Sequence, residues 1–326
     1  MTNLKKNLVT FSIILYSFEK CYIKRPMERD GIKFFDENIV RRGEITDKTI
    51  SFFKGTKIPM PSIFEISNSG MCNRKCSFCP RSDPDYKHVN EFISEMLHEK
   101  IYDELKENNF SGSVIFSGFV EPLLDKRIYK QIREIRNKLP QANIELITNG
   151  DPLNHERIEK LFDSGLSYLL VSAYDSEEQA IRFRAMLDKT NVDSSKYIVR
   201  NRYYGEEKDF GITISNRGGN MNNTEYKIEA LKEPLKNKCT YPAYTFFIDY
   251  NGDVLTCSHD WGKDMVMGNL NNNSIFEIWT GKKFSSARRN LLNANRNFSP
   301  CNVCNVRGGL IGIKHADYWS KELNEK

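Results

Sequence analysis

Apolar residues along this chain form short runs rich in β-branched and aromatic side chains, and these runs alternate with segments of helical period. The predicted strands cover residues 63–66, 113–117, 143–148, 168–173, 197–200 and 211–215. The predicted helices cover residues 90–107, 126–139, 154–163 and 176–187. Alternation of this kind is typical of βαβ units that build a parallel sheet, in which functional residues gather at the carboxyl ends of the strands. The pattern predicts an α/β fold with its site at that edge.

The alternation breaks near the end of the predicted sheet. Only residues 201–210 separate the last two predicted strands, whereas a crossover between parallel strands normally needs a dozen residues or more. Either these two segments form a hairpin, or one of them is not a strand of the sheet. We therefore expect a barrel-like sheet that is incomplete at its closing edge.

The composition is that of a folded protein, because 39% of the 326 residues are hydrophobic and 28% are charged. This length suits one barrel-type domain with a smaller appendage. The longest apolar stretch, residues 8–18, is interrupted by polar residues and is shorter than the roughly 20 residues of a membrane span. We interpret this stretch as a strand or a short buried helix and not as an export signal. We therefore expect a cytoplasmic protein. The net charge of +5 is too small to indicate a nucleic-acid partner.

Seven of the eight cysteines fall into two groups. The first group is Cys72, Cys76 and Cys79, and the second is Cys239, Cys257, Cys301 and Cys304. Clustered thiols in a chain without an export signal indicate metal binding rather than disulfides. Three thiols are one ligand short of a structural zinc site unless another residue such as His88 completes it, whereas an iron–sulfur cluster held by three cysteines leaves one iron open to an external ligand.

The first group lies in the sequence Cys-Asn-Arg-Lys-Cys-Ser-Phe-Cys-Pro, residues 72–80, just after the predicted strand 63–66. It resembles the CxxxCxΦC signature of the radical S-adenosylmethionine (radical SAM) enzymes, with Phe78 at the aromatic position. The resemblance implies a partial (β/α)6 barrel of the TIM type. It also implies a [4Fe-4S] cluster on Cys72, Cys76 and Cys79 whose open iron binds SAM, with Phe78 near the adenine.

The resemblance extends to the predicted strand ends. Residues 117–122, Ser-Gly-Phe-Val-Glu-Pro, are similar to the family's glycine-rich turn, in which a glutamate engages the amino group of SAM. This implies that Glu121 binds SAM, although Val120 stands where the family usually has glycine. It likewise implies that Ser172 contacts the ribose. Arg217 and Arg184 are weaker candidates than Ser172, for binding the SAM carboxylate or the substrate.

The second group resembles the SPASM domain and its shortened form, the twitch domain. The residues on which this resemblance rests are Cys239, the Gly252-x4-Cys257 spacing after a predicted hairpin strand at 246–250, and Cys301-x2-Cys304. The resemblance implies a second [4Fe-4S] cluster with all four cysteines as ligands. The same four thiols could also form a zinc ribbon.

The sequence therefore predicts an N-terminal extension of unknown role (residues 1–60), a radical SAM barrel (61–225) and a small α+β iron–sulfur domain (226–326). The resemblance implies an oxidoreductase that cleaves SAM to a 5′-deoxyadenosyl radical and takes hydrogen from a small polar substrate, sugar-like or aminocyclitol-like, and so dehydrogenates it. Electrons would come from a donor such as flavodoxin or ferredoxin. No catalytic base is identified. The alternatives are an epimerase, with Cys21 as hydrogen donor, a peptide-modifying enzyme and, more distantly, a zinc-binding interaction module.

Overall fold

The structure is a computed structural model that describes residues 27–29, 32–34, 37–48, 50–202, 215–222 and 228–324. Three sequence predictions lie outside these residues: the apolar stretch 8–18, the thiol of Cys21, and the strand at 211–215 except for its last residue. None of the described helices is both long and apolar enough to cross a membrane.

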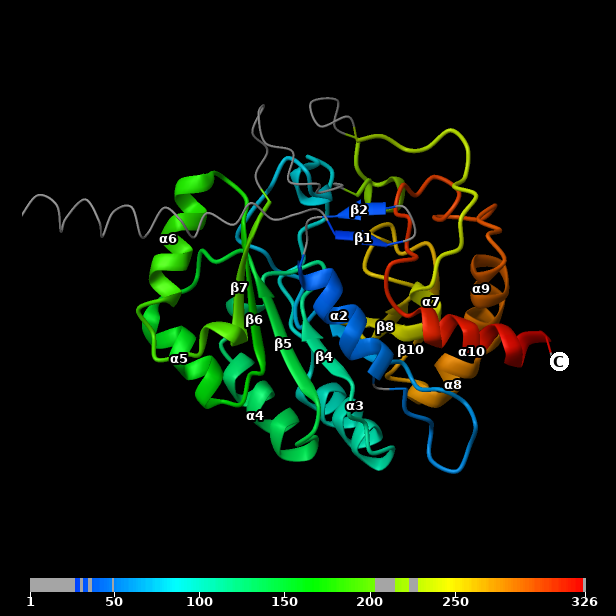
Figure 1. The fold of residues 1–326 in the computed structure, drawn as a ribbon, viewed down its shortest axis with the longest axis horizontal. Helices are drawn as coiled ribbons and strands as arrows, with labels where there is room; N and C mark the ends of the chain where they lie inside the picture. The colour runs from blue at the N-terminus through cyan, green and yellow to red at the C-terminus, as the bar shows by residue number, and fades with distance from the viewer. Residues whose placement is uncertain are drawn as a thin grey trace, which may run out of the picture.

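Five parallel strands form the body of an open sheet (Figure 1). They are β3 (Ile63–Ile66), β4 (Ser113–Phe116), β5 (Asn143–Thr148), β6 (Tyr168–Ala173) and β7 (Tyr197–Asn201). The helices between them are α3 (Glu95–Glu107), α4 (Ile128–Lys138), α5 (His155–Asp163) and α6 (Glu177–Leu187). Among the residues that the structure describes, the sheet runs in the order β10-β9-β8-β3-β4-β5-β6-β7 and ends at β7 without closing. The expected open, partial barrel is confirmed.

Helix starts are set by short polar side chains. The side chains of Ser94, Asn154 and Ser176 each accept a hydrogen bond from the backbone N–H three residues later, which satisfies one of the unpaired donors of a first helical turn. The helix predicted from residue 90 therefore begins at Glu95. The strands at 143–148 and 168–173 have the predicted bounds.

The C-terminal segment extends the same sheet. Strand β8 (Thr245–Ile248) pairs parallel to β3, and it continues through antiparallel β9 (Asp253–Leu255) and β10 (Val266–Asn269). The predicted hairpin is present, and Gly252 takes the positive φ of +87° that its turn requires. The sheet is thus continuous across the predicted boundary at residue 225, and the domain limits stay a prediction. Helices α7 (Tyr241–Tyr244), α8 (Ile275–Thr280), α9 (Lys282–Leu292) and α10 (Ile313–Asn324) complete this part.

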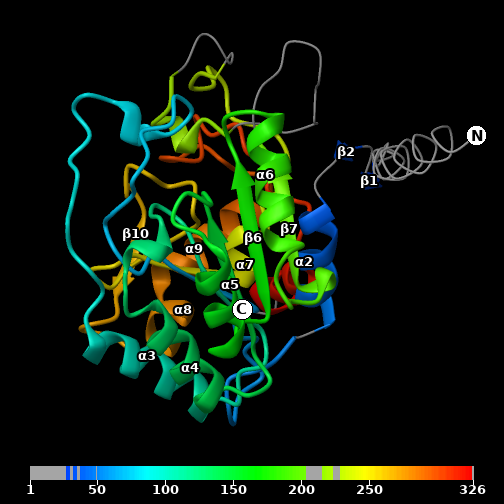
Figure 2. The ribbon, with the colours of Figure 1, turned by 90° about the vertical axis from the view of Figure 1, so that its left-hand side faces the viewer.

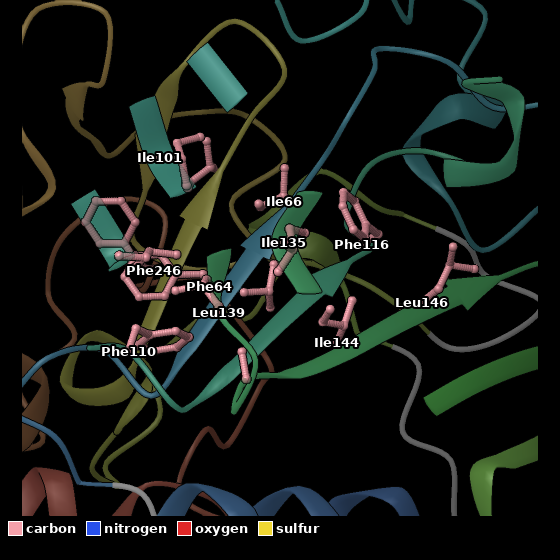
Figure 3. Packing of buried hydrophobic residues seen from close by; sticks show 14 of the residues in the cluster. Phe64, Ile66, Ile101, Phe110, Phe116, Ile135, Leu139, Ile144, Leu146 and Phe246 are labelled. Atoms are coloured by element: carbon pink, nitrogen blue, oxygen red, sulfur yellow. The ribbon is translucent and has the colours of Figure 1, made fainter. Parts of the chain in front are cut away.

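The two faces of the sheet differ in chemistry. One face packs its apolar side chains, among them Phe64, Phe116 and Leu146, against helices of the outer layer in the main core (Figure 3). Strand residues alternate between faces, so the opposite face carries a polar series: Glu65, Ser117, Glu145 and Ser172. We call this the inner face.

An N-terminal segment of the chain covers the inner face of the sheet. Helix α2 (Glu37–Lys48) follows a short hairpin of β1 (Met27–Arg29) and β2 (Ile32–Phe34) and lies in front of the sheet, beside α7 and α10 (Figure 1). The view in Figure 2 places the sheet between α2 on one side and α3 and α4 on the other. The carboxyl ends of the strands, where the candidate site residues were expected, lie at one edge of this covered face.

Candidate active site

The first three cysteines occupy the loop that leaves the carboxyl end of β3, as predicted. Cys72, Cys76 and Cys79 are half-buried free thiols, and the backbone N–H of Cys79 closes a turn on the Cys76 carbonyl at 2.9 Å. Burial raises the pKa of the Cys76 thiol to about 11, and the charge of Cys79 adds to the rise, so the thiols lie within electrostatic reach of one another. The guanidinium of buried Arg81 fixes the end of the loop by donating to the carbonyls of Gly70 (2.8 Å) and Phe119 (2.6 Å).

A second arginine ties the middle of this loop to two strand ends. Arg74 binds Asp151, which follows β5, through two hydrogen bonds of 2.6 Å, and Asp175, which follows β6, at 2.6 and 2.9 Å. Asn73 adds a contact of 2.9 Å to Asp151. Because the fork of a guanidinium matches a carboxylate in two places, these pairs fix orientation as well as distance. Sequence analysis noted Asp175 as a strand-end candidate beside Ser172, but it did not single out Arg74 or Asp151.

Glu121 is a buried carboxylate at the end of β4. It accepts hydrogen bonds from the hydroxyl of Thr148 (2.8 Å) and the backbone N–H groups of Asn149 (2.7 Å) and Leu123 (3.1 Å). Burial raises the pKa of Glu121 to about 7 even though these donors oppose the rise. A carboxylate offers about four acceptor positions, so these three hydrogen bonds do not use all of them. Its charge also reaches Cys72, which puts it beside the cysteine loop, where the resemblance places it.

The turn before Glu121 explains the departure at Val120. Gly118 has φ +93°, and a Cβ atom there would lie 2.4 Å from the Ser67 hydroxyl oxygen, so only glycine fits. Val120 does not have a positive φ. Its side chain packs against a small apolar cluster that contains Phe119 and Phe247. The backbone freedom that the turn needs is thus supplied by Gly118, two residues before the valine.

Two further predicted SAM contacts meet at β6. The ring of Phe78 packs against Tyr174, with ring centroids 5.1 Å apart. Ser172 is buried on the inner face and hydrogen-bonds to Tyr174. Phe78 and Ser172 therefore both contact Tyr174, and the structure brings them close together. Arg184, on α6, donates at 2.6 Å to Asn201, which pairs with Ala173 at the end of β6.

Arg217 lies between the two cysteine groups. It has φ +52°, and its Nε is buried without a hydrogen-bond partner among the described residues. Burial lowers the pKa of Arg217, while the charges of Cys79 and Tyr174 act in the opposite direction. An unpaired buried N–H costs roughly 1–3 kcal/mol, which a bound anion or hydroxyl would recover.

A hydrogen-bonded chain lies beside Arg217. The Ser215 hydroxyl and the Tyr241 hydroxyl contact the two ring nitrogens of His259, at 3.0 and 3.2 Å. Burial, helped by the charge of Arg217, lowers the pKa of His259 to about 3, so the imidazole is neutral. Neither Tyr241 nor His259 was singled out from the sequence.

The second cysteine group is assembled from four separate loop and turn positions. Cys239 precedes α7, Cys257 follows β9, and Cys301 and Cys304 lie in a turn after α9. Burial raises the pKa of Cys301 to about 12, and the charges of Cys239 and Cys304 add to the rise.

One buried guanidinium organises these loops. Arg296 donates to the carbonyls of Asn237 (3.0 Å), Val306 (2.7 Å), Lys238 (3.3 Å) and Arg307 (2.5 Å). Asn237 and Lys238 precede Cys239 in the sequence, and Val306 and Arg307 follow Cys304. Arg296 therefore holds two cysteine-bearing segments in register, and its charge opposes the rise in the Cys304 pKa that burial causes.

The donor sets suit iron–sulfur clusters. In the described part of the chain, no three His, Cys, Asp or Glu side chains converge on a position for a single metal ion. The thiolates that hold a four-iron cluster lie farther apart than those that hold a single ion. The thiol positions are therefore compatible with a cluster and give no support to a preformed zinc site. Buried thiols with raised pKa values lose their protons when iron supplies the positive charge that their surroundings lack.

A carboxylate that sequence analysis missed faces the same region. Glu65, on the inner face of β3, accepts a hydrogen bond from Ser117 at 2.5 Å through Oε1, and its Oε2 has no partner among the described residues. Burial raises the pKa of Tyr241 well above its ordinary value, and the charges of Cys257 and Glu65 contribute, so Glu65 lies near the second cysteine group. We refer to the region between Glu65, Ser117, Tyr241 and Arg217 as the chamber, and a substrate role for it is proposed below.

Family comparison agrees with this geometry. Residues 66–201 match the radical SAM superfamily, and residues 239–305 match the SPASM iron–sulfur cluster-binding domain. The first match contains Cys72, Cys76 and Cys79, and the second contains the other four clustered cysteines.

Known proteins similar to this chain include an enzyme and solved structures. The S-adenosyl-L-methionine-dependent 2-deoxy-scyllo-inosamine dehydrogenase of Niallia circulans is 29% identical over 246 residues, which is 75% of this chain and 92% of that protein. The crystal structure of BtrN in complex with AdoMet and 2-DOIA has a TM-score of 0.65 at 27% identity, covering 79% of this chain and 95% of that one. The structure of anSMEcpe with bound AdoMet, at 14% identity and TM-score 0.51, covers 81% and 94% and is similar in fold.

The two cysteine groups predict two separately lost clusters. We expect anaerobically prepared protein to contain about eight iron and eight sulfide per chain, and a variant with Cys72, Cys76 and Cys79 all changed to Ala to lose about half of each. Iron and acid-labile sulfide assays measure this. A matched variant, Cys301→Ala with Cys304→Ala, should lose the other half. Stoichiometric zinc without broad visible absorption would contradict the prediction.

The raised pKa of Glu121 predicts a pH-dependent affinity for SAM. An ammonium group needs the ionised carboxylate, which in the free protein forms as the pH rises through about 7. SAM affinity should therefore increase with pH up to about 7 and level off above it. Glu121→Gln should weaken binding roughly 10- to 150-fold and remove this dependence, since a charge-assisted hydrogen bond contributes about 1.5–3 kcal/mol. Calorimetric titration between pH 6 and 8.5 measures both; equal profiles for variant and wild type would show that Glu121 does not bind SAM.

Proposed function

Because the chain is a radical SAM enzyme with a C-terminal SPASM-like iron–sulfur domain, we propose that it dehydrogenates a small hydroxylated substrate of the aminocyclitol or sugar class. When bound, SAM and the two clusters supply hydrogen-atom abstraction and one-electron transfer. The residues of the chain bind the substrate, orient it and exclude water. The similarity to a dehydrogenase over 92% of that enzyme's length supports the proposal.

The observation that carries the proposal is the position of the four-thiol group beside the chamber. Loss of one hydrogen atom from a carbinol carbon leaves one proton and one electron to be removed before a carbonyl forms. A group with all four ligands from cysteine has no open position for the substrate, so its use is to accept that electron. Arg217 lies within electrostatic range of Cys79 and Tyr241, and Tyr241 lies within range of Cys257. These two residues therefore link the two thiol groups.

The chamber suits a substrate with several hydroxyl groups and an amine. The free Oε2 of Glu65 can accept from a hydroxyl or pair with an ammonium. The relative's printed substrate, 2-deoxy-scyllo-inosamine, carries both kinds of group. For this chain we propose the same substrate class, with Glu65 as the polar anchor.

The SAM-binding roles expected from the sequence are part of the same proposal. Glu121 binds the amino group of SAM, Phe78 packs near its adenine, Ser172 contacts the ribose, and Arg217 binds the carboxylate or the substrate. A protein donor of the flavodoxin or ferredoxin type supplies the electron that starts each turnover.

Epimerisation is the second candidate reaction, since it needs a hydrogen donor instead of an electron acceptor. Cys21 is the cysteine left over for that role, and it lies outside the described residues. The complete four-thiol group favours dehydrogenation.

Turnover in heavy water separates the two reactions. We expect an oxidised product without solvent deuterium on carbon. Cys301→Ala should abolish substrate oxidation while leaving some SAM cleavage, and Cys21→Ala should be nearly silent. Mass spectrometry of the product measures the outcome. Deuterium on carbon without a change of oxidation state, together with an inactive Cys21→Ala variant, would establish the epimerase.

Loss of the Glu65 charge should act on substrate affinity. Glu65→Gln keeps the shape of the side chain but loses a charge-assisted contact, so KM for an aminocyclitol should rise roughly 10- to 150-fold. SAM affinity should stay unchanged. Steady-state kinetics give KM, and the exposed Glu107→Gln variant is the control. An unchanged KM would remove Glu65 from the substrate site.

A further inference from the structure

Two arginines of α2 reach the inner face of the sheet and bind one buried carboxylate. Nη2 of Arg41 lies 2.8 Å from Oε2 of Glu145, and Nη2 of Arg42 lies 3.2 Å from the same oxygen. The Glu145 side chain is only 1% exposed. Its other oxygen accepts a hydrogen bond from Asn143 at 2.5 Å.

The negative charge of Glu145 depends on the presence of helix α2. Burial by itself raises the pKa of Glu145, but Arg42 and Arg41 outweigh burial and hold that pKa below its usual range. Withdrawal of α2 would leave the ionised Glu145 carboxylate on the inner face without a cationic partner, which is strongly unfavourable for a buried charge. The pair therefore ties the position of α2 to β5.

Further contacts define where α2 sits. The guanidinium of Arg41 lies 3.7 Å from the centre of the Tyr168 ring on β6, which adds a cation–π contact. On its other side α2 packs against α10, and Lys314 donates to the carbonyl of Asp47 at 3.3 Å. The helix thus joins the inner face of the sheet to the C-terminal helix, as Figure 1 shows.

Strand register places this contact level with the chamber. Glu65 pairs with Ile115, and Ile115 pairs with Glu145, so the two glutamates lie on the same face two strands apart. The charge of Arg42 also reaches Tyr244, whose ring stacks on Tyr241 at 5.7 Å. The chamber is therefore bounded on this side by α2.

The helix lies before the part of the chain that matches the radical SAM superfamily, which begins at residue 66. Glu145 lies inside that matched region, so the contact joins it to a helix that precedes it in the sequence.

We propose that α2 is a plug that closes the open side of the sheet at the chamber, with Arg41 and Arg42 as positioning residues that act through Glu145. The plug keeps water away from the reacting substrate and so keeps SAM consumption coupled to substrate oxidation. The coupling part rests on the proposed function; the closing of the sheet does not.

Three full-length variants test this inference. In Arg41→Met/Arg42→Met the buried Glu145 loses its partners. In the triple variant that adds Glu145→Met, no charge is left to bury, and replacing a whole buried ionic group by apolar residues is often tolerated. Arg133→Met, at an exposed position on α4, is the control.

Hydrogen exchange of the purified full-length proteins tests the plug itself. We expect amides of residues 37–48 to exchange at least about tenfold faster in the double variant, and the triple variant and control to stay near wild type. Unchanged protection in the double variant would overturn the inference, whether or not the substrate has been identified.

The ratio of 5′-deoxyadenosine to oxidised product tests the effect on coupling. We expect this ratio to rise several-fold in the double variant and to return toward the wild-type value in the triple variant. Faster exchange with an unchanged ratio would show a structural helix and would overturn the positioning role. If wild type oxidises no aminocyclitol or sugar, the proposed function fails, and the exchange experiment still decides whether α2 closes the sheet.

Discussion

The structure depends on supplying hydrogen-bond donors or cations to carboxylates on the inner face of the sheet and at its edge. An ordinary α/β barrel fills its interior with layers of branched aliphatic side chains. Here the corresponding positions include Glu65 and Glu145, and Glu121 follows at a strand end. An ionised carboxylate without partners in such a place costs several kcal/mol, so each one needs donors. Ser117, the arginines of α2, and the end of β5 supply them.

Buried guanidinium groups solve a related problem in the loops. Both cysteine groups lie on irregular backbone, whose carbonyls find no partners in a sheet or helix and must be satisfied in another way. Arg81 bonds two carbonyls around the first loop, and Arg296 bonds four around the second. A single planar side chain can do this because its donors are held in a rigid fork. The loops are thereby positioned without regular structure of their own.

Sequence analysis succeeded where the signal is local. The strands at 143–148 and 168–173 are apolar runs whose limits coincide with those of the structure, and the cysteine spacings pointed to the two domains that the family comparison matches. It missed the pairing of β8 with β3, because a hairpin has the same sequence pattern whichever strand it joins. It also missed the contact between Arg42 and Glu145, since an ion pair across 103 residues leaves no periodicity to detect. Glu65 was overlooked because one carboxylate within an apolar run gives no sign of which face it occupies.

The first cysteine loop is held at its end by buried Arg81 but at its middle by Arg74, whose contacts are weaker, and this difference from the second cysteine group follows their chemistry. Arg74, which ties the first loop to Asp151 and Asp175, makes contacts that are partly exposed, and ion pairs of this kind are weakened by water and salt. The second loop set is held by buried Arg296 and by Asn216, whose amide bonds the backbone of Val303 and Asn305. A loop whose cluster must accept a ligand at an open iron has to adjust as that ligand enters and leaves. A four-thiol set that only passes an electron gains from rigidity, because its geometry need not change. The distribution of exposed and buried anchors thus matches the division of labour between the two sites.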